Sequence, residues 1–170
     1  MEYIDSPNMS EEKIESKKQQ RENVKTKCIF CLCATENKDE DNLILARAKY
    51  SCVIMNRYPY SVGHLLIVPY RHTADLLSLS DEEKLEIFTL TQKNISVLQK
   101  IMNPDGFNIG MNLGKAGGAG IETHLHLHVV PRWSGDVNFM SVTAETKVLP
   151  EALGVTYQKI LNEWKIWDNL

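Results

Sequence analysis

Hydrophobic positions along the chain fall into short runs and two longer periodic stretches. The short runs are rich in β-branched and aliphatic residues, which is typical of β-strands. The longer stretches repeat apolar residues every three or four positions, which indicates helices. Strands are predicted over residues 43–48, 51–55, 64–69, 107–112 and 124–131, and helices over residues 80–102 and 149–164.

The longer predicted helix has a defined start and end. Ser80 is a good N-cap, and Glu83, three residues later, completes a capping box. Residues 103–106, Asn-Pro-Asp-Gly, are a turn signal at its end. The helical spacing predicts an inner face made of Leu85, Phe88, Leu90, Ile95, Leu98 and Ile101. Strands in hairpin order with inserted helices predict an α+β domain, with a mainly antiparallel five-stranded sheet, one long helix and one C-terminal helix.

Length and charge narrow the class of protein. A chain of 170 residues suits one globular domain, expected over residues 25–170, after a polar leader over residues 1–24. A net charge of -3 gives no general basic surface, so nucleic acid is not an expected partner. No apolar run is long enough for a membrane span and the N-terminus is not signal-like, so we expect a cytoplasmic protein without a membrane partner.

The segment around residues 124–130 carries the strongest chemical signal. Successive side chains of a strand point to opposite faces, so His124, His126 and His128 share one face and the intervening aliphatic residues share the other. The aliphatic face belongs to the core, which leaves three imidazoles on a functional or solvent face. His124 and His128 are about 13 Å apart along a strand, too far to bind one metal ion together. The three histidines must therefore divide between tasks.

A glycine-rich loop precedes these histidines. Residues 114–120 include four glycines, Gly117 and Gly118 among them, which allow main-chain amides to turn toward an anion. Taken alone, the loop fits a flexible hairpin equally well, because it lacks the P-loop pattern and a following helix. Its position beside three imidazoles favours a phosphate site.

These motifs resemble a known family. The segment His-Leu-His-Leu-His-Val-Val over residues 124–130 resembles the signature of the histidine-triad (HIT) superfamily, and Asn56, residues 63–69 and Asn112 stand at the expected intervals before it. The resemblance covers residues 27–133. The continuation over residues 131–140 is similar to a bacterial branch related to Fhit-type dinucleoside polyphosphate hydrolases and diadenosine tetraphosphate phosphorylases.

The resemblance implies a role for each matching residue. His126 would be the nucleophile that attacks an α-phosphorus and forms a nucleotidyl-histidine intermediate. His128 would contact the phosphate or the leaving-group oxygen, and His64 would support the phosphate pocket from the neighbouring strand. Asn112 would bind phosphate and Asn56 the ribose hydroxyls. Without the resemblance, a strand-end polar residue and a turn residue are equally good interpretations of His64 and Asn56.

A second constellation indicates a metal. Cys28-Ile29-Phe30-Cys31 is a CxxC pair, which needs two more ligands to close a tetrahedral zinc site, and His72 and His124 are uncommitted. Zinc-bearing HIT proteins resemble this arrangement, which implies a structural zinc held by Cys28, Cys31, His72 and His124. A redox pair or simple buried thiols are the alternatives. The other two cysteines are Cys33, a spare ligand candidate, and Cys52, expected in the core.

The leading functional hypothesis is an enzyme that cleaves dinucleoside polyphosphates, such as diadenosine tetraphosphate, at the α-phosphate, with water or orthophosphate as acceptor. The alternatives are a Hint-like nucleoside phosphoramidase and a nucleotide-binding regulatory protein with incidental turnover. Glu122 and Thr123 stand where Fhit and Hint types carry glutamine and Ser or Thr, and the extra charge puts the acceptor and the phosphate chain length in question. HIT domains pair through the long helix and the following edge strand, so a homodimer is expected.

Overall fold

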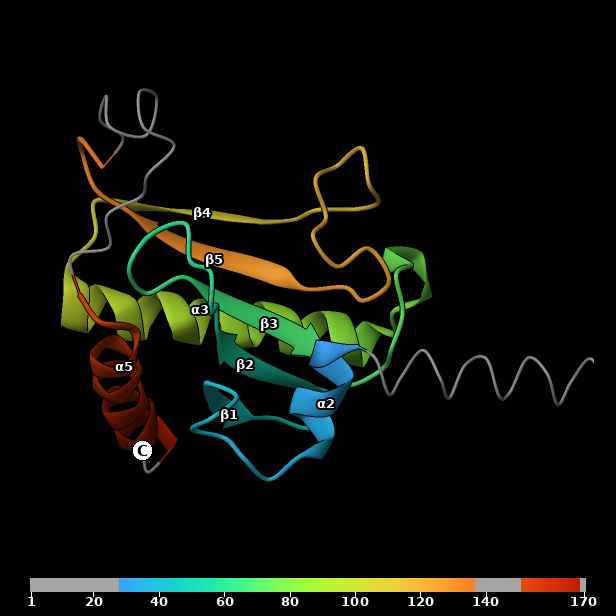
Figure 1. Cartoon of the computed structure of the whole chain (residues 1–170), viewed down its shortest axis with the longest axis horizontal. Coiled ribbons are helices and arrows are strands. Elements are labelled where there is room, and N and C mark those ends of the chain that lie inside the picture. Colours follow the sequence, from blue (N-terminus) through green and yellow to red (C-terminus); the bar gives the residue numbers. More distant parts are fainter. Residues whose placement is uncertain (1–27, 137–150, 169–170) are drawn as a thin grey trace, which may run out of the picture.

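The computed structural model describes residues 28–136 and 151–168 of the chain (Figure 1). The predicted leader, residues 1–24, lies outside the described residues. The helices and strands are α2 (Ile29–Thr35), β1 (Ile44–Arg47), β2 (Ser51–Met55), β3 (Leu65–Pro69), the short 3-10 helix η1 (Leu76–Ser78), α3 (Asp81–Met102), β4 (Gly106–Met111), β5 (Leu127–Arg132) and α5 (Leu153–Asp168). None of the helices in the described part is long and apolar enough to cross a membrane.

The five strands form one sheet in the order β1-β2-β3-β5-β4, with every neighbouring pair antiparallel. The α+β class and the five-stranded antiparallel sheet are therefore confirmed. β5, the last strand in the chain, lies between β3 and β4, so the chain crosses the sheet through α3 before β5 fills the gap (Figure 1). The segment that carries the three histidines thus leads into the interior of the sheet.

α3 begins as its sequence predicts. The Ser80 hydroxyl accepts a hydrogen bond from the Glu83 amide at 3.2 Å, and the Glu83 carboxylate accepts one from the Ser80 amide at 2.7 Å. The predicted inner face is wrong at two positions, since Leu85 is 70% exposed and Phe88 is 68% exposed. The buried residues of α3 are Glu83, Ile87, Leu90, Thr91, Asn94, Val97 and Leu98. Apolar residues lie all around this helix, so periodicity alone chose the wrong stripe.

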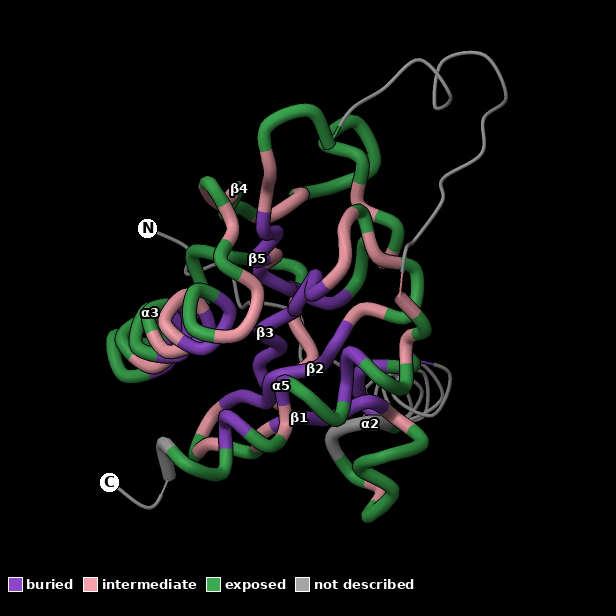
Figure 2. The backbone as a smooth tube through the Cα atoms, turned by 90° about the vertical axis from the view of Figure 1, so that its left-hand side faces the viewer, coloured by how far each residue is buried: buried purple, intermediate pink, exposed green. Residues whose placement is uncertain are grey.

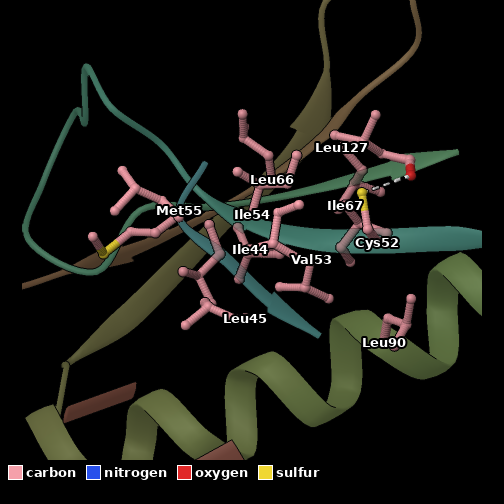
Figure 3. Close-up of a cluster of buried hydrophobic side chains, with 14 of the residues drawn as sticks. Ile44, Leu45, Cys52, Val53, Ile54, Met55, Leu66, Ile67, Leu90 and Leu127 are labelled. Carbon is pink, nitrogen blue, oxygen red and sulfur yellow. Dashed lines mark hydrogen bonds between the residues drawn. The ribbon is translucent and has the colours of Figure 1, made fainter. Parts of the chain in front are cut away.

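The core lies between the sheet and the helices. Buried segments concentrate in the central strands, and the outer side of α3 is exposed (Figure 2). Directly paired residues of antiparallel strands share a face, so Val53 and Ile67 lie on one face of the sheet and Ile54 and Leu66 on the other. In Figure 3, Val53 points toward α3 while Leu66 points away from it. α5 contacts α3 and β1, where the Tyr157 hydroxyl donates to the Ile44 carbonyl at 2.9 Å.

Three local elements differ from their predictions. The C-terminal helix α5 spans Leu153–Asp168 and not residues 149–164. The CxxC pair lies at the start of α2, a helix of seven residues that was not predicted. β5 begins at Leu127 rather than at His124. The residues before Leu127 bond to the loop after β3 instead of to a strand, since the Leu125 amide donates to the Thr73 carbonyl at 2.7 Å. Cys52 is fully buried, as expected, and the side chain of Cys33 lies outside the described residues.

Candidate active site and metal centre

The pairing of β3 with β5 brings the predicted histidines together. His128 pairs with Leu66, so it lies on the face of the sheet that points away from α3. His64 precedes β3 and shares this face with Leu66 by alternation. On the other side of His128, β4 places Gly110 opposite it, and a Cβ added at Gly110 would meet nothing within 4 Å. The structure thus leaves space beside His128.

The His126 ring is held in one tautomer. Its Nδ1 lies 2.9 Å from the carbonyl oxygen of His124, and a carbonyl only accepts, so Nδ1 carries the proton. The other nitrogen, Nε2, then carries the lone pair. His126 as a whole residue is 7% exposed, so the residue is largely covered rather than open to solvent. A neutral imidazole oriented in this way is a nucleophile that needs no further deprotonation.

His64 and His128 form a hydrogen-bonded pair. The Tyr60 amide donates to His64 Nδ1 at 3.0 Å, and His64 Nε2 lies 2.9 Å from His128 Nδ1. His128 Nε2 is buried and has no hydrogen-bond partner among the described residues. Burial is the main cause that lowers the pKa of His128 to about 4, and the neighbouring His126 is the smaller cause. This ring is therefore neutral near pH 7.

Two aromatic residues that the sequence analysis did not single out contact these rings. Phe30, on α2, lies 5.0 Å from the His126 ring and 5.6 Å from the His124 ring, centroid to centroid. Tyr60 stacks on His64 at 4.9 Å and on His128 at 5.9 Å. Their sequence signals were present, a Phe inside the CxxC pair and a Tyr-Pro-Tyr just before His64, but neither residue type has a specific chemical meaning in isolation.

Asn56 also lies beside His64. Its Nδ2 is 3.3 Å from His64 Nδ1, and its Oδ1 accepts from the Tyr58 amide at 3.0 Å. These contacts use one of the two N–H groups and one of the two lone pairs of the amide. The predicted ribose contact therefore has to use the remaining donor and acceptor.

The glycine loop has structural reasons for its glycines. A Cβ at Gly117 would lie 2.5 Å from the Leu113 carbonyl oxygen, and Gly118 adopts a φ of +81°, a conformation that L side chains rarely adopt. The Asn112 side chain donates to the Gly118 carbonyl at 3.3 Å and so fastens the loop. These contacts explain the residues without a ligand, and phosphate binding by Asn112, Gly117 and Gly118 stays a prediction.

The four predicted metal ligands converge at the other end of this segment. Because β3 and β5 are antiparallel, the residues after β3 lie beside those before β5, which places His72 next to His124. α2 adds Cys28 and Cys31, and the four ligand atoms all lie within 4.8 Å of one another. Cys28 Sγ is 3.4 Å from His124 Nδ1, and Cys31 Sγ is 3.2 Å from His72 Nδ1 and 3.6 Å from His124 Nδ1.

These separations fit one tetrahedral ion. Bond lengths of 2.3 Å to sulfur and 2.0–2.1 Å to nitrogen place neighbouring ligands about 3.6 Å apart. The His124 Nε2 proton is donated to the Pro69 carbonyl at 2.8 Å, which turns the Nδ1 lone pair toward the two thiols. Burial lowers the pKa of His124, which keeps the ring neutral and able to ligate. The donor set therefore matches a closed zinc site.

A five-stranded antiparallel sheet with three alternating histidines on the segment that leads into and through its interior strand β5 is the arrangement of the histidine-triad class of proteins. The HIT domain family model matches residues 37–135, and the chain belongs to this family. The family predicted from the sequence is therefore confirmed.

Individual relatives agree with this assignment. An AP-4-A phosphorylase of Mycobacterium tuberculosis is 44% identical over 126 residues, which span 74% of this chain and 65% of the relative. An asymmetrical bis(5'-nucleosyl)-tetraphosphatase of Schizosaccharomyces pombe is 31% identical over 55% of this chain and 50% of its own length. The chain thus spans less than two-thirds of either relative. A zinc-bound histidine triad family protein of Mycobacterium smegmatis shares the fold, with a TM-score of 0.68, 23% identity, and coverage of 85% of this chain and 98% of the other.

Proposed function

We propose that the protein is an enzyme that cleaves dinucleoside polyphosphates at an α-phosphate by transferring the nucleotidyl group to His126. The observation that carries this proposal is the bond from His126 Nδ1 to the His124 carbonyl, which leaves the Nε2 lone pair available for attack. The similarity to a phosphorylase and a tetraphosphatase of such substrates supports the substrate class.

The reaction has two displacement steps. His126 Nε2 forms a bond to the α-phosphorus, and the bond from that phosphorus to its bridging oxygen breaks, so the polyphosphate end leaves with the bridging oxygen. Water or orthophosphate then attacks the same phosphorus and breaks the P–N bond. With diadenosine tetraphosphate, ATP leaves first, and the second product is AMP with water or ADP with orthophosphate.

The other predicted residues would bind and orient the substrate. His128 directs its Nε2 proton to a phosphate or leaving-group oxygen, with His64 behind it. Asn112, Gly117 and Gly118 line the loop that holds the phosphate chain, and the remaining donor and acceptor of Asn56 bind a ribose. Hydrogen bonds from neutral N–H groups to a phosphate strengthen as charge develops on its oxygens, which is how such contacts lower the barrier.

We also propose that Cys28, Cys31, His72 and His124 hold a structural zinc ion. Four protein ligands close the coordination shell, so the ion has no open position for water or substrate. Its role is to fix α2 against the segment that carries His126. The support is the convergence of the four ligand atoms and the likeness in fold to a zinc-bound family member.

Product analysis tests the proposed function. Diadenosine tetraphosphate is incubated with the zinc-loaded protein with and without orthophosphate, and with His126→Ala as control. We expect ATP in both cases, with AMP in water and ADP in orthophosphate if that is the acceptor. Cleavage of a nucleoside phosphoramidate but not of dinucleoside polyphosphates would instead identify a phosphoramidase, and tight nucleotide binding without any turnover would identify a regulatory protein.

We further propose that the protein acts as a cytoplasmic homodimer. β4 is an edge strand of the described sheet, with Ile109 47% exposed, and α3 exposes Leu85 and Phe88. Pairing two such edges removes an exposed strand and covers these side chains. Sedimentation equilibrium should give a dimer of the 19.4 kDa chain. Phe88→Glu should shift it toward monomer, while Tyr58→Glu, at an exposed position of the loop before β3, should not; a monomeric wild type would exclude the dimer.

A further inference from the structure

A chain of hydrogen bonds connects the main chain to His128. The Tyr60 amide can only donate, so His64 Nδ1 is the acceptor of their 3.0 Å bond and His64 carries its proton on Nε2. The Asn56 Nδ2 group donates to the same nitrogen. His64 Nε2 then donates to His128 Nδ1 at 2.9 Å. A neutral His128 must therefore carry its own proton on Nε2, the nitrogen that has no partner among the described residues.

The Tyr60 ring covers this pair. It stacks on His64 with an angle of 27° between the rings and on His128 with an angle of 19°. Tyr60 as a whole residue is 55% exposed. The loop that carries Tyr60 is hydrogen-bonded to β5, because the Ser61 hydroxyl donates to the Pro131 carbonyl at 2.7 Å. The Tyr60 ring therefore stacks on the pair from a loop that is hydrogen-bonded to β5.

We propose that Tyr60 is a positioning residue that fixes the tautomers of His64 and His128 through its amide and shields the pair with its ring, so that His128 meets a substrate as a neutral Nε2–H donor. The proposal rests on the proposed function only for the identity of the acceptor, an oxygen of the nucleotide phosphate. The tautomers themselves are a property of the protein without substrate.

A positively charged His128 would break this arrangement, since it would turn a second N–H toward the His64 N–H. The titratable groups of the described residues that face His128 are His126 on the same segment, His64 before β3 and Tyr60 in the loop. Burial is the largest cause that lowers the pKa of His128, to about 4. The Tyr60 ring supplies part of that burial, so removing it should raise the pKa.

The first test measures the tautomers directly. Long-range ¹H–¹⁵N spectra are recorded on the full chain, zinc-loaded, labelled at histidine nitrogens and free of nucleotide, at pH 7. The five histidines are assigned with His64→Asn and His128→Asn. We expect the proton on Nε2 in His64 and His128 and on Nδ1 in His126. A proton on Nδ1 of His128, or a charged His128 at this pH, would overturn the proposal while leaving the nucleotidyl transfer to His126 untouched.

The second test removes the ring. Tyr60→Leu is compared with Tyr60→Phe, which keeps the stacked ring, and with Tyr58→Leu, which removes a tyrosine that is 82% exposed in the same loop. In Tyr60→Leu the pKa of His128 should rise from about 4 toward about 6.5, the usual value for histidine. The ratio of kcat at pH 5.5 to kcat at pH 7.5 should then fall by up to about tenfold.

Tyr60→Phe and Tyr58→Leu should keep the wild-type pKa of His128 and the wild-type ratio of the two kcat values. Loss of metal at low pH should affect all variants alike. A Tyr60→Leu titration equal to that of Tyr58→Leu would overturn the shielding role. A Tyr60→Phe variant that fails to restore the wild-type behaviour would do the same. If Tyr60→Leu does not fold, the Tyr60→Phe titration and the tautomers of the unmodified chain still decide the proposal.

Discussion

His124 and His126 are two residues apart on the same extended segment, yet they lie in regions of opposite character. His124 belongs to the metal-ligand cluster, where four side chains from three parts of the chain turn inward onto one point. His126, with His128 and His64, belongs to the group that we propose binds and attacks a substrate, the reaction histidines. In the proposed function, the metal-ligand cluster is closed by its own side chains, whereas the reaction histidines contact a substrate.

The difference depends on which carbonyl each ring meets. The Pro69 carbonyl takes the Nε2 proton of His124, so Nδ1 faces the thiols, whereas the His124 carbonyl takes the Nδ1 proton of His126, so Nε2 keeps its lone pair. The same side chain thus presents opposite nitrogens at two neighbouring positions. Main-chain acceptors therefore determine which ring nitrogen of each histidine keeps its lone pair.

The largest effect is expected at the reaction histidines. His126→Ala removes the proposed covalent nucleophile, so turnover should fall by up to about 10⁶-fold, as for other nucleophile deletions. Nucleotide affinity, measured by equilibrium dialysis, should stay close to that of the wild type because the phosphate contacts remain. Turnover near the wild-type rate would show that His126 is not the nucleophile.

The metal-ligand cluster should respond in stability rather than in rate. Cys31→Ser or chelation should remove the ion and cost about 2 kcal/mol or more, which lowers the melting temperature by about 4–8 °C for a domain of this size. The rate per folded molecule should change much less. Metal analysis should find one zinc ion per wild-type chain. A rate that follows zinc occupancy while the fold stays intact would place the metal in the chemistry and merge the two regions.

A smaller effect concerns pH. Burial lowers the pKa of His128 to about 4, so the unfolded chain, with an imidazole pKa of about 6.5, binds this proton first as the pH falls. Stability contributed by the neutral ring is present above pH 6.5 and is lost between pH 6.5 and 4. We expect about 1–2 kcal/mol, allowing for partial exposure.

Urea unfolding of the wild type and of His128→Asn at pH 7.5 and pH 5 measures this loss, because only the wild type carries the titrating ring. The stability difference between the two proteins should shrink at the lower pH. A difference that does not change with pH would mean that His128 is already solvated.

The smallest effect tests the space beside His128. Gly110→Ala adds a methyl group where nothing in the protein lies within 4 Å, so stability should change by no more than about 1 kcal/mol. The methyl would project next to His128, and KM should rise several-fold with little change in kcat. Gly106→Ala is the control, since it adds the same group in open space at the other end of β4, opposite Arg132. Equal KM values for the two variants would show that substrate does not occupy this space.

Strand alternation and helix capping were enough to predict much of the fold from the sequence. The alternating histidines placed His126 and His128 correctly relative to Leu127, and the capping box fixed the first residue of α3 to within one position. Both are local patterns with one dominant physical cause. The inner face of α3 failed because Leu85 and Phe88 compete with Ile87 and Val97, and only tertiary packing decides which stripe is buried.

The candidate site was proposed from residue types, and its contacts could not be predicted. Cys28, Cys31, His72 and His124 could be grouped from residue types and the family likeness, and the structure brings their ligand atoms together. The tautomers could not be predicted, because they depend on whether Pro69, His124 and Tyr60 place a carbonyl or an amide within 3 Å of a ring nitrogen. α2 was missed because seven residues carry too few turns for a periodic signal.

The position of β5 has a consequence for how the protein is made. β3 and β4 leave the ribosome before β5, yet β5 must enter between them, so the sheet stays split until the chain has been synthesised past Arg132. Such non-local pairing is the slow kind of step in folding. The proposed nucleophile His126 and the proposed metal ligand His124 lie on the segment that leads into this strand. Under the proposed function, a chain that ends before His124 has neither its nucleophile nor a complete set of metal ligands, so activity is gained only when the sheet closes.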